Sequence, residues 1–373
     1  MALRLMGLSE QNLTFSNGQV YGKDRGFFNA LSHHYTLAGM ISVRLPKSVQ
    51  AVYRMLHFRA DRSRWRTASS LNAGAFTHRT RLAERYLSQR AGEYDLIVQM
   101  HTLTAAGTQP RPYVLTTDNT FLLSEKYWPE WVPLRPRDRE QWIALERQVY
   151  QKAAYLFPWS EFTRQSLIHD YGIAPEKIIV TGCGAYFETD QPGAGGYDSQ
   201  TALFVGAEFK RKGGQTLLTA WQQVCRKLPQ AQLIIVGPRA IPHPLPPNTL
   251  YYGQINDRQR LEQVFRQAAV FVMPSIFEPW GHVFLEAMGL GLPCIGTNIC
   301  AMPEIIRADE TGLIVPVGDA EALAEALITL LSDPDRAQQM GRQGYAAAVE
   351  HYNWNAVAAR MFPYIEQAAL TGR

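Results

Sequence analysis

The chain has 373 residues, 46% of them hydrophobic, and a formal net charge of +4. At roughly 150 residues per domain this length predicts about two domains, each with enough apolar residues for a core of its own. No run approaches the roughly 20 uninterrupted apolar residues of a membrane-spanning helix, so the composition argues against an integral membrane protein.

The amino-terminal stretch and the cysteines bear on the compartment of the protein. The first residues show no long apolar core and no small-residue cleavage site, so we expect no signal peptide. Cys183, Cys225, Cys294 and Cys300 show no metal-ligand spacing and lie mostly among apolar residues. We therefore expect four buried thiols in a reducing cytoplasm.

Short apolar runs alternate with helical patterns through the first half of the chain. The runs are LRLMGLS, MISVRLP, YDLIVQM, PYVLTTD, AAYLFPWS and KIIVTG, and helices are predicted over 80–91 and 139–153. Strands and helices in alternation predict a parallel sheet with right-handed crossovers.

Positive charge is concentrated in this first half. Residues 1–187 hold 23 Lys and Arg against 15 Asp and Glu, a balance of +8. Residues 188–373 hold 14 against 18, a balance of −4. A function that needs a basic surface, such as binding an anionic partner, would therefore lie in the first half of the chain.

The densest basic segment is 54–90, which holds nine arginines against Asp61 and Glu84 and also carries several aromatic and aliphatic side chains. Such a segment can mark contact with an anionic acceptor, nucleic acid or an anionic membrane, and a solvated helical face is the alternative that the sequence favours. Because the acidic second half does not continue the basic surface, we expect no nucleic-acid partner. Peripheral contact with an anionic membrane stays a hypothesis.

The second half repeats the alternation of apolar runs and helical patterns. The runs are ALFVGA, AQLIIVG, TLYYG, VFVMPS, PCIGT and GLIVPV, which predict a second parallel sheet. The segment 187–200, FETDQPGAGGYDSQ, is rich in Gly and polar residues. We interpret it as the linker between two domains.

Two glutamates eight residues apart, Glu278 and Glu286, are the strongest candidates for a functional site. Glu278 follows the run AVFVMPS, and Glu286 lies on the helix predicted for GHVFLEAMGL, so both can face the crevice where open α/β sheets bind ligands. The helix is predicted to begin at Gly281, and its N-terminus suits an anion such as a diphosphate. Ionised carboxylates accept hydrogen bonds from the hydroxyls of a sugar or a ribose. A helix cap and a solvated side chain would show the same spacing.

The segment FVGAEFKRKGG, 204–214, predicts a phosphate site. A strand is followed by Lys210, Arg211 and Lys212 and then by two glycines at a helix start, where backbone can approach a ligand and cations can offset a diphosphate. The glycine spacing does not fit a nucleoside-triphosphate P-loop. A solvated basic turn is the alternative interpretation.

Together these segments resemble the retaining glycosyltransferases of the GT-B fold, in the glycosyltransferase group 1 family. The similarity covers 155–360 and runs through FPWSEFTRQSLIHDYGIAPEKIIVTGCGA, the basic turn, LIIVGP and VFVMPSIFEPWGHVFLEAMGLGLPCIGTNICAMPEIIRADETGLIVPVGD. It implies an α/β chain of two doubly wound Rossmann-like domains that face a central cleft. The implied parts are an acceptor-binding domain over 1–187, a donor-binding domain over 188–350 and a helix over 351–373 that crosses back to the first domain.

The resemblance also implies roles for individual residues. Glu278 would contact the donor sugar and Glu286 the nucleotide ribose. The donor diphosphate and the sugar hydroxyls would be held by side chains and backbone N–H groups of Arg211, Lys212, Gly281, His282 and Val283.

Two positions depart from the family pattern. Ala207 stands where many relatives have Arg, so Arg211 is expected to take that share of the charge. Asp118, in LTTDNT, stands where relatives often have His, and His101, at the end of LIVQMH, is a second candidate to face the donor sugar. The candidate catalytic residues are therefore Glu278, Asp118 and His101.

The implied activity is that of a hexosyltransferase. A sugar would pass, with retention, from a nucleotide-diphosphate sugar to a hydroxyl of a sugar, glycolipid or small glycoside, in the cytoplasm or at the inner face of the membrane. No metal or other cofactor is expected, because cations and a helix dipole take up the diphosphate charge. The alternatives are an epimerase-like enzyme on the same fold and a protein that binds a nucleotide sugar without transferring it. The residues do not specify the base, the sugar or the acceptor.

Overall fold

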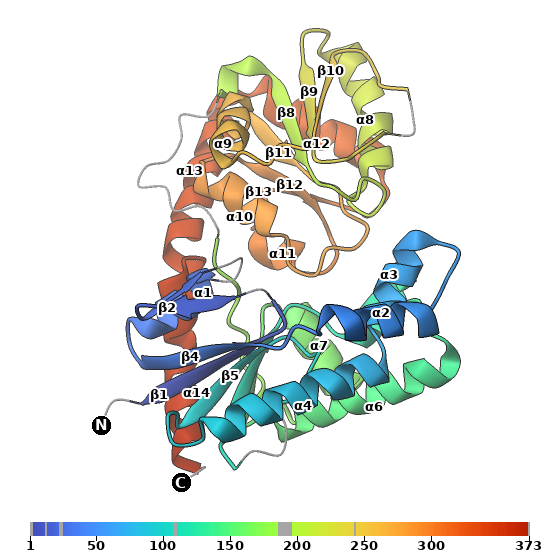
Figure 1. The fold of residues 1–373 in the computed structure, drawn as a ribbon. Helices are drawn as coiled ribbons and strands as arrows, with labels where there is room; N and C mark the ends of the chain where they lie inside the picture. Colours follow the sequence, from blue (N-terminus) through green and yellow to red (C-terminus); the bar gives the residue numbers. More distant parts are fainter. Residues whose placement is uncertain are drawn as a thin grey trace. The chain divides into compact units, whose positions relative to one another are not determined.

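The computed structural model describes residues 3–11, 13–21, 25–106, 110–185, 196–241 and 244–371. The chain forms two compact units, one of residues 1–182 with 354–373 and the other of residues 183–353. Each unit contains one parallel β-sheet covered by helices (Figure 1). The expected α/β class with two Rossmann-like sheets is thereby confirmed, while the predicted boundary between 187 and 188 lies outside the described residues.

The sheet of the first unit has five strands in the order β4-β1-β5-β6-β7, and all neighbours are parallel. The strands are β1 (Arg4–Ser9), β4 (Thr36–Ser42), β5 (Leu96–Met100), β6 (Tyr113–Thr117) and β7 (Tyr155–Pro158). β5 and β6 are buried along their whole length. Strands covered on both faces read as continuous apolar runs, which is why the sequence identified them.

Helices cover both faces of this sheet. They are α1 (Arg25–Ser32), α2 (Lys47–Leu56), α3 (Arg62–Ser70), α4 (Ala73–Gln89), α5 (Phe121–Tyr127), α6 (Pro136–Lys152), α7 (Glu161–His169) and α14 (Trp354–Thr371). Successive side chains of a strand point to opposite faces, so Leu96 packs with α1 and α14 whereas Ile97 packs with α4 and α6. The two apolar cores lie on opposite faces, as a doubly wound sheet requires.

The carboxyl-terminal helix α14 belongs to the first unit. Arg360 on α14 donates two hydrogen bonds to the carbonyl of Thr181, at 2.8 and 2.6 Å. The ring of Phe362 stacks on His34, which follows α1, with ring centroids 4.1 Å apart. Met361 and Ile365 complete the core on that face of the sheet.

One strand predicted for the first unit is absent, and one hairpin was not predicted. KIIVTG, 177–182, is no strand; only Ile178 forms an isolated bridge, to Leu156. Its backbone donates to β7, but β7 ends in Pro158, which has no N–H to donate in return. The segment after β1, for which the apolar runs predict no strand, contains a hairpin of β2 (Thr14–Ser16) and β3 (Gln19–Tyr21). Its two central residues, 17 and 18, are Asn and Gly with φ of 52° and 77°, the pair that tight hairpin turns favour.

The sheet of the second unit has six parallel strands in the order β10-β9-β8-β11-β12-β13. The strands are β8 (Thr201–Val205), β9 (Gln232–Val236), β10 (Thr249–Gly253), β11 (Val270–Val272), β12 (Cys294–Thr297) and β13 (Gly312–Val315). The helices are α8 (Gly214–Lys227), α9 (Arg258–Gln267), α10 (His282–Gly289), α11 (Met302–Ile305), α12 (Ala320–Ser332) and α13 (Pro334–His351). Each of the six predicted runs overlaps one of these strands.

The strand order reverses once in each sheet. In the first unit the chain builds β4 on one side of β1 and β5 on the other, and in the second it builds β9 on one side of β8 and β11 on the other. A crevice opens at the carboxyl ends of the strands at such a switch point, and open α/β sheets bind ligands there. The switch points are therefore the first places to look for a site.

Two further expectations can be compared with the structure. Of the four thiols expected to be buried, those of Cys183, Cys294 and Cys300 are buried and that of Cys225 is half-buried. No helix in the described part of the chain is long and apolar enough to cross a membrane.

Candidate active site

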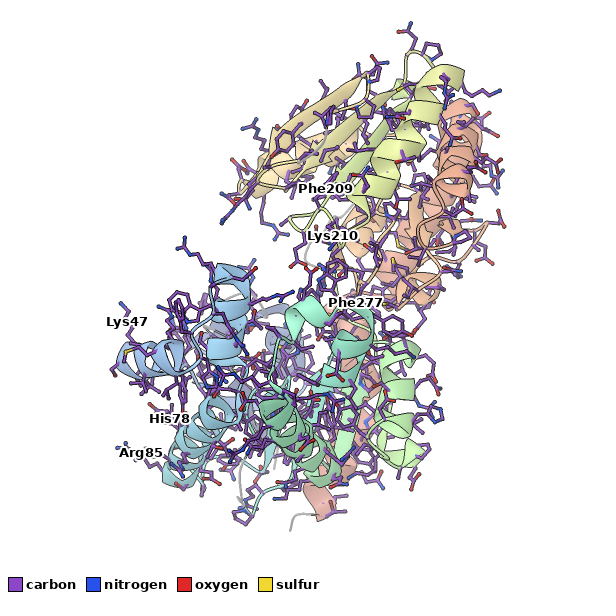
Figure 2. All side chains as sticks on the ribbon, turned by 90° about the vertical axis from the view of Figure 1, so that its right-hand side faces the viewer. Lys47, His78, Arg85, Phe209, Lys210 and Phe277 are labelled. Atoms are coloured by element: carbon purple, nitrogen blue, oxygen red, sulfur yellow. The ribbon has the colours of Figure 1, made fainter. Side chains whose placement is uncertain are left out.

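The loops that follow β8 and β11 meet at the switch point of the second unit. Gly213, which precedes α8, has φ of 73°, and a Cβ at this position would lie 1.7 Å from the carbonyl oxygen of Pro274. Only glycine permits both the backbone conformation and this approach. Figure 2 shows Lys210 on the first loop and Phe277 on the second. The glycine recognised in the sequence thus brings the basic turn against the segment that carries Glu278.

Arg211 is buried between these loops, with 5% of its surface exposed. Its Nη1 donates to the carbonyl of Phe277 at 2.6 Å and to Oε2 of Glu278 at 3.2 Å, and its Nε donates to Glu208. The backbone carbonyl of Arg211 accepts from the N–H of Ile276 at 2.8 Å. Arg211 therefore fixes the two loops to each other.

Lys212 pairs with the same carboxylate. Its Nζ lies 3.0 Å from Oε2 of Glu278 and 3.2 Å from the sulfur of Met273. Burial by itself would raise the pKa of Glu278, but Lys212 and Arg211 outweigh it, and the pKa is lowered below its ordinary value. Glu278 is thus an ionised carboxylate that shares two cations.

Helix α10 begins directly beside this cluster. Gly281 has φ of 93°, and a Cβ there would lie 2.9 Å from the ring of Phe284 and 3.4 Å from Cγ of Glu278. His282 and Val283 form the first turn of α10, where backbone N–H groups have no acceptor within the helix. The positive end of this helix therefore lies next to the cations and to Glu278.

Glu286 lies one turn further along α10 and is half-buried. Its side chain has no hydrogen-bond or ion-pair partner among the residues that the structure describes. Burial raises its pKa to about 7, and Arg258 and Lys212 offset only part of this effect. Glu286 thus contrasts with Glu278: the carboxylate of Glu278 is compensated by two cations, whereas that of Glu286 pairs with no cation within the described residues.

Sequence reasoning identified Arg211, Lys212 and Glu278 but not the link to Glu208. Glu208 lies three residues before Arg211 and binds its Nε. The (i, i+3) spacing of Glu and Arg was the available signal. Arg211 binds two carboxylates and a carbonyl, whereas Lys212 pairs with one carboxylate, that of Glu278. Lys212 therefore has fewer partners within the protein than Arg211.

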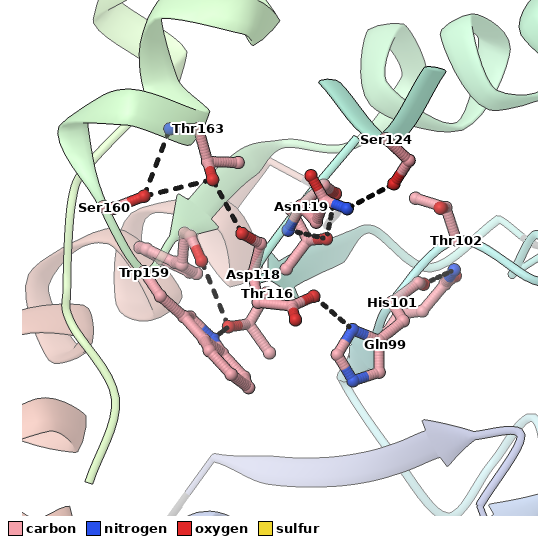
Figure 3. Close-up of polar contacts among 12 residues, drawn as sticks. Gln99, His101, Thr102, Thr116, Asp118, Asn119, Ser124, Trp159, Ser160 and Thr163 are labelled. Carbon is pink, nitrogen blue, oxygen red and sulfur yellow. Dashed lines mark hydrogen bonds and ion pairs between the residues drawn. The ribbon is translucent and has the colours of Figure 1, made fainter. Parts of the chain in front are cut away.

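His101 and Asp118 lie in the first unit, at the carboxyl ends of the adjacent strands β5 and β6. Nδ1 of His101 is 3.5 Å from Oδ1 of Asp118, and both side chains are partly exposed. Figure 3 shows the Asp118 carboxylate directed at the His101 ring. The sequence offered them as two separate candidates, and the structure brings them together as a pair.

The pair has a fixed surrounding. His101 has φ of 60°, a conformation that side chains other than Gly rarely adopt, and such residues cluster at functional sites. Its ring lies 5.8 Å from that of Trp159, whose Nε1 donates to Oγ1 of Thr116 at 2.8 Å. The backbone carbonyl of Asp118 accepts from Oγ1 of Thr163 at 2.7 Å (Figure 3). Asp118 and His101 are therefore held in place from several neighbouring elements.

The predicted residues thus form two groups, one in each unit. Within the described ranges, no cluster of three or more His, Cys, Asp or Glu side chains could hold a metal ion. The chemistry available at these groups is that of ionised carboxylates, buried cations, a helix N-terminus and an imidazole.

Comparison with known proteins finds a family similarity in the second unit. Residues 189–347 match the family described as Glycosyl transferases group 1. The phosphatidyl-myo-inositol mannosyltransferase of Mycobacterium leprae is 33% identical over 181 residues, which are 46% of this chain and 48% of that protein. The chain therefore spans about half the length of this relative.

Solved structures give the fold of both units. Sucrose-phosphate synthase from Thermosynechococcus elongatus superposes with a TM-score of 0.66, at 24% identity, over 80% of this chain and 79% of that one. HepE of Anabaena, solved in complex with UDP and glucose, superposes with a TM-score of 0.60, at 16% identity, over 98% and 100%. The chain thus has the GT-B fold, and its residues 189–347 are similar to glycosyl transferases of group 1.

Proposed function

We propose that this chain is a retaining glycosyltransferase that moves a sugar from a nucleotide-diphosphate sugar to a hydroxyl acceptor. The observation that carries the proposal is the cluster at the switch point of the second unit. This cluster contains Arg211, Lys212, the start of α10 and two glutamates. The pKa of one glutamate, Glu278, is lowered, and the pKa of the other, Glu286, is raised. The family match over this unit and the named transferase among its relatives support the same activity.

We propose a part for each of these groups at the donor, and their contacts support it. The diphosphate would lie against the first turn of α10 and Nζ of Lys212, where a helix dipole and a cation both favour negative charge. The ribose hydroxyls would donate to Glu286, the carboxylate that lacks a partner among the described residues. Glu278, fixed and ionised, would accept from hydroxyls of the sugar.

The cluster acts by positioning and electrostatics. As the bond between sugar and diphosphate breaks, negative charge grows on the leaving diphosphate, and donors already in place stabilise it without reorganising. We propose that Lys212, Arg211 and the start of α10 take up this charge without a metal ion. The leaving diphosphate would accept the acceptor proton on the face from which the hydroxyl attacks, which retains the configuration.

The acceptor would bind to the first unit. His101 and Asp118 lie at the carboxyl ends of β5 and β6, beside the switch point of that sheet. An imidazole and a carboxylate 3.5 Å apart can orient a hydroxyl by accepting and donating hydrogen bonds. We propose that this pair positions the acceptor or the transferred sugar.

Peripheral contact with an anionic membrane is a further part of the proposal. Val52, Met55, Leu56 and Phe58, on α2 and just after it, are exposed, Met55 by 78% and Phe58 by 66%. Arginines of the segment 54–90 surround these side chains in the sequence. Apolar side chains among cations are typical of a surface that rests on anionic lipid.

A melting-temperature screen against uridine, guanosine and adenosine diphosphates tests the donor part. A ligand at about 100 times its dissociation constant should add roughly 2.7 kcal/mol to the free energy of unfolding. Hydrolysis of the matching nucleotide sugar without acceptor would then separate an active transferase from a protein that only binds the donor. If none of the three diphosphates stabilises the protein, the donor assignment is wrong.

A further inference from the structure

A charged cavity lies in the first unit, and neither His101 nor Asp118 lines it. Its volume is about 240 Å³, and it lies at the carboxyl ends of β1 and β4, next to α2, α3 and α4. Its charged lining residues are Glu10, Arg44, Arg54, Arg66 and Arg79. Glu10 directly follows β1, so the cavity borders the switch point of this sheet, where ligands bind.

Arg79 forms the inner wall of the cavity. It is 6% exposed, and its Nη1 donates to the carbonyls of Ser70 and Leu103, at 3.1 and 3.4 Å. Its Nε and Nη2 have no hydrogen-bond acceptor within the described ranges. Burial lowers the pKa of this guanidinium, and the charge of Glu10 offsets part of the effect. A buried guanidinium with unused donors is a built site for an anion, since Arg binds phosphate through a fork of N–H groups.

The other arginines add to an excess of positive charge. Arg44, Arg54 and Arg66 are exposed at the rim and form no ion pair with any residue that the structure describes. Four guanidinium groups therefore face a single carboxylate, that of Glu10. The volume of about 240 Å³ is well above the roughly 10–15 Å³ that a cavity needs to hold one water molecule. This is enough for a phosphate group together with part of the molecule that carries it.

We propose that this cavity binds a phosphate group of the acceptor, so that the acceptor class is a phosphate-bearing polyol, sugar or lipid. That the bound molecule is an acceptor rests on the proposed function, whereas the binding of phosphate by the cavity does not. A free phosphate monoester and a phospholipid headgroup offer the same chemistry to the arginines. The exposed side chains of Met55 and Phe58 lie close in sequence to Arg54, which suits the lipid source.

The experiment uses the full chain and two probes, glycerol phosphate in solution and phosphatidylcholine vesicles that contain phosphatidic acid. Arg44→Gln combined with Arg66→Gln should raise the dissociation constant for a probe about tenfold or more, because hydrogen bonds to charged groups are lost. Both residues are exposed, so the variant should keep the melting temperature of the natural chain. Arg85→Gln is the matched control, since Arg85 is exposed on α4 outside the cavity (Figure 2).

The donor site could also bind a phosphate probe, so Lys212→Met is measured in parallel. It should weaken binding of a nucleoside diphosphate and leave binding of the probe unchanged, while the double arginine variant should do the reverse. Binding of glycerol phosphate would identify a soluble acceptor, and binding of vesicles alone a lipid acceptor. The proposal is overturned if neither probe binds, or if the double arginine variant and Arg85→Gln bind the probe equally. Failure of nucleoside diphosphate to bind would instead count against the proposed function.

Discussion

Replacing Glu286 with Gln should stabilise the ligand-free protein at neutral and alkaline pH while weakening its binding of a nucleotide. The carboxylate is half-buried and has no ion-pair or hydrogen-bond partner within the described ranges, and burial raises its pKa to about 7 from 4.5. Gln has the same shape and carries no charge. The substitution therefore removes the cost of ionising a desolvated group and also removes a charged acceptor.

The sign follows from proton binding. Between about pH 4.5 and pH 7 the folded state holds a proton on Glu286 that the unfolded state has released, so the free energy of unfolding falls as pH rises. The stabilising contribution is complete below the unfolded pKa and is lost as pH rises through the folded pKa. At about 1.4 kcal/mol per pH unit, the free energy of unfolding falls by roughly 3 kcal/mol in total, and most of this loss occurs between about pH 5 and pH 8.

Denaturant unfolding of the natural chain and of Glu286→Gln at about pH 5 and about pH 8.5 measures this difference. The advantage of the variant should grow by about 2 to 3 kcal/mol between the two conditions. Glu325→Gln is the matched control, because Glu325 is exposed on α12 in the same unit. Nucleoside diphosphate affinity of Glu286→Gln should fall by about 1.5 to 3 kcal/mol. A stability difference that does not change with pH, or a variant that is less stable at high pH, would refute the reasoning.

Three further predictions concern the cluster and the surface. Glu278→Gln should lower turnover with donor more than affinity for the bare nucleoside diphosphate, as expected of an interaction that strengthens in the transition state; equal losses would assign Glu278 to nucleotide binding. Lys212→Met should weaken binding of a nucleoside diphosphate and spare the uncharged nucleoside, and equal losses in calorimetry would show that the turn acts by shape. Met55→Ser combined with Phe58→Ser should reduce co-sedimentation with anionic vesicles at low salt; an unchanged bound fraction would contradict membrane contact.

The second sheet could be predicted from the sequence because its strands are short, apolar and separated by helices. Buried parallel strands need apolar side chains on both faces, and that requirement is visible in the residues. The failures had local causes that a pattern of apolar residues does not contain. KIIVTG has the composition of a strand but meets Pro158 at the edge of β7. The turn at 17 and 18 carried its signal in two residues, Asn and Gly, that the alternation of apolar runs ignores.

The candidate site was predictable in its members and not in its contacts. Arg211 and Glu278 are 67 residues apart, and spacing along the chain does not show that they share a hydrogen bond. Their proximity follows from the placement of β8 next to β11, which brings together the loops at the carboxyl ends of these strands. In the same way, the sequence offered His101 and Asp118 as separate candidates, whereas the adjacency of β5 and β6 makes them a pair.

Glu278 and Glu286 differ in whether their charge is compensated before a ligand binds. Glu278 is compensated in the ligand-free protein, and Arg211 is held by Glu208 and the Phe277 carbonyl as well as by Glu278. If a diphosphate binds to Nζ of Lys212 as proposed, Arg211 still neutralises Glu278, so this buried carboxylate keeps a partner. Glu286 has no cation that plays the part of Arg211, and under the proposed function it would gain its hydrogen bonds from the ligand. If a nucleotide binds as proposed, the cost of ionising Glu286 in the ligand-free protein would be offset by hydrogen bonds formed only in the complex, so the residue would favour binding at the expense of stability.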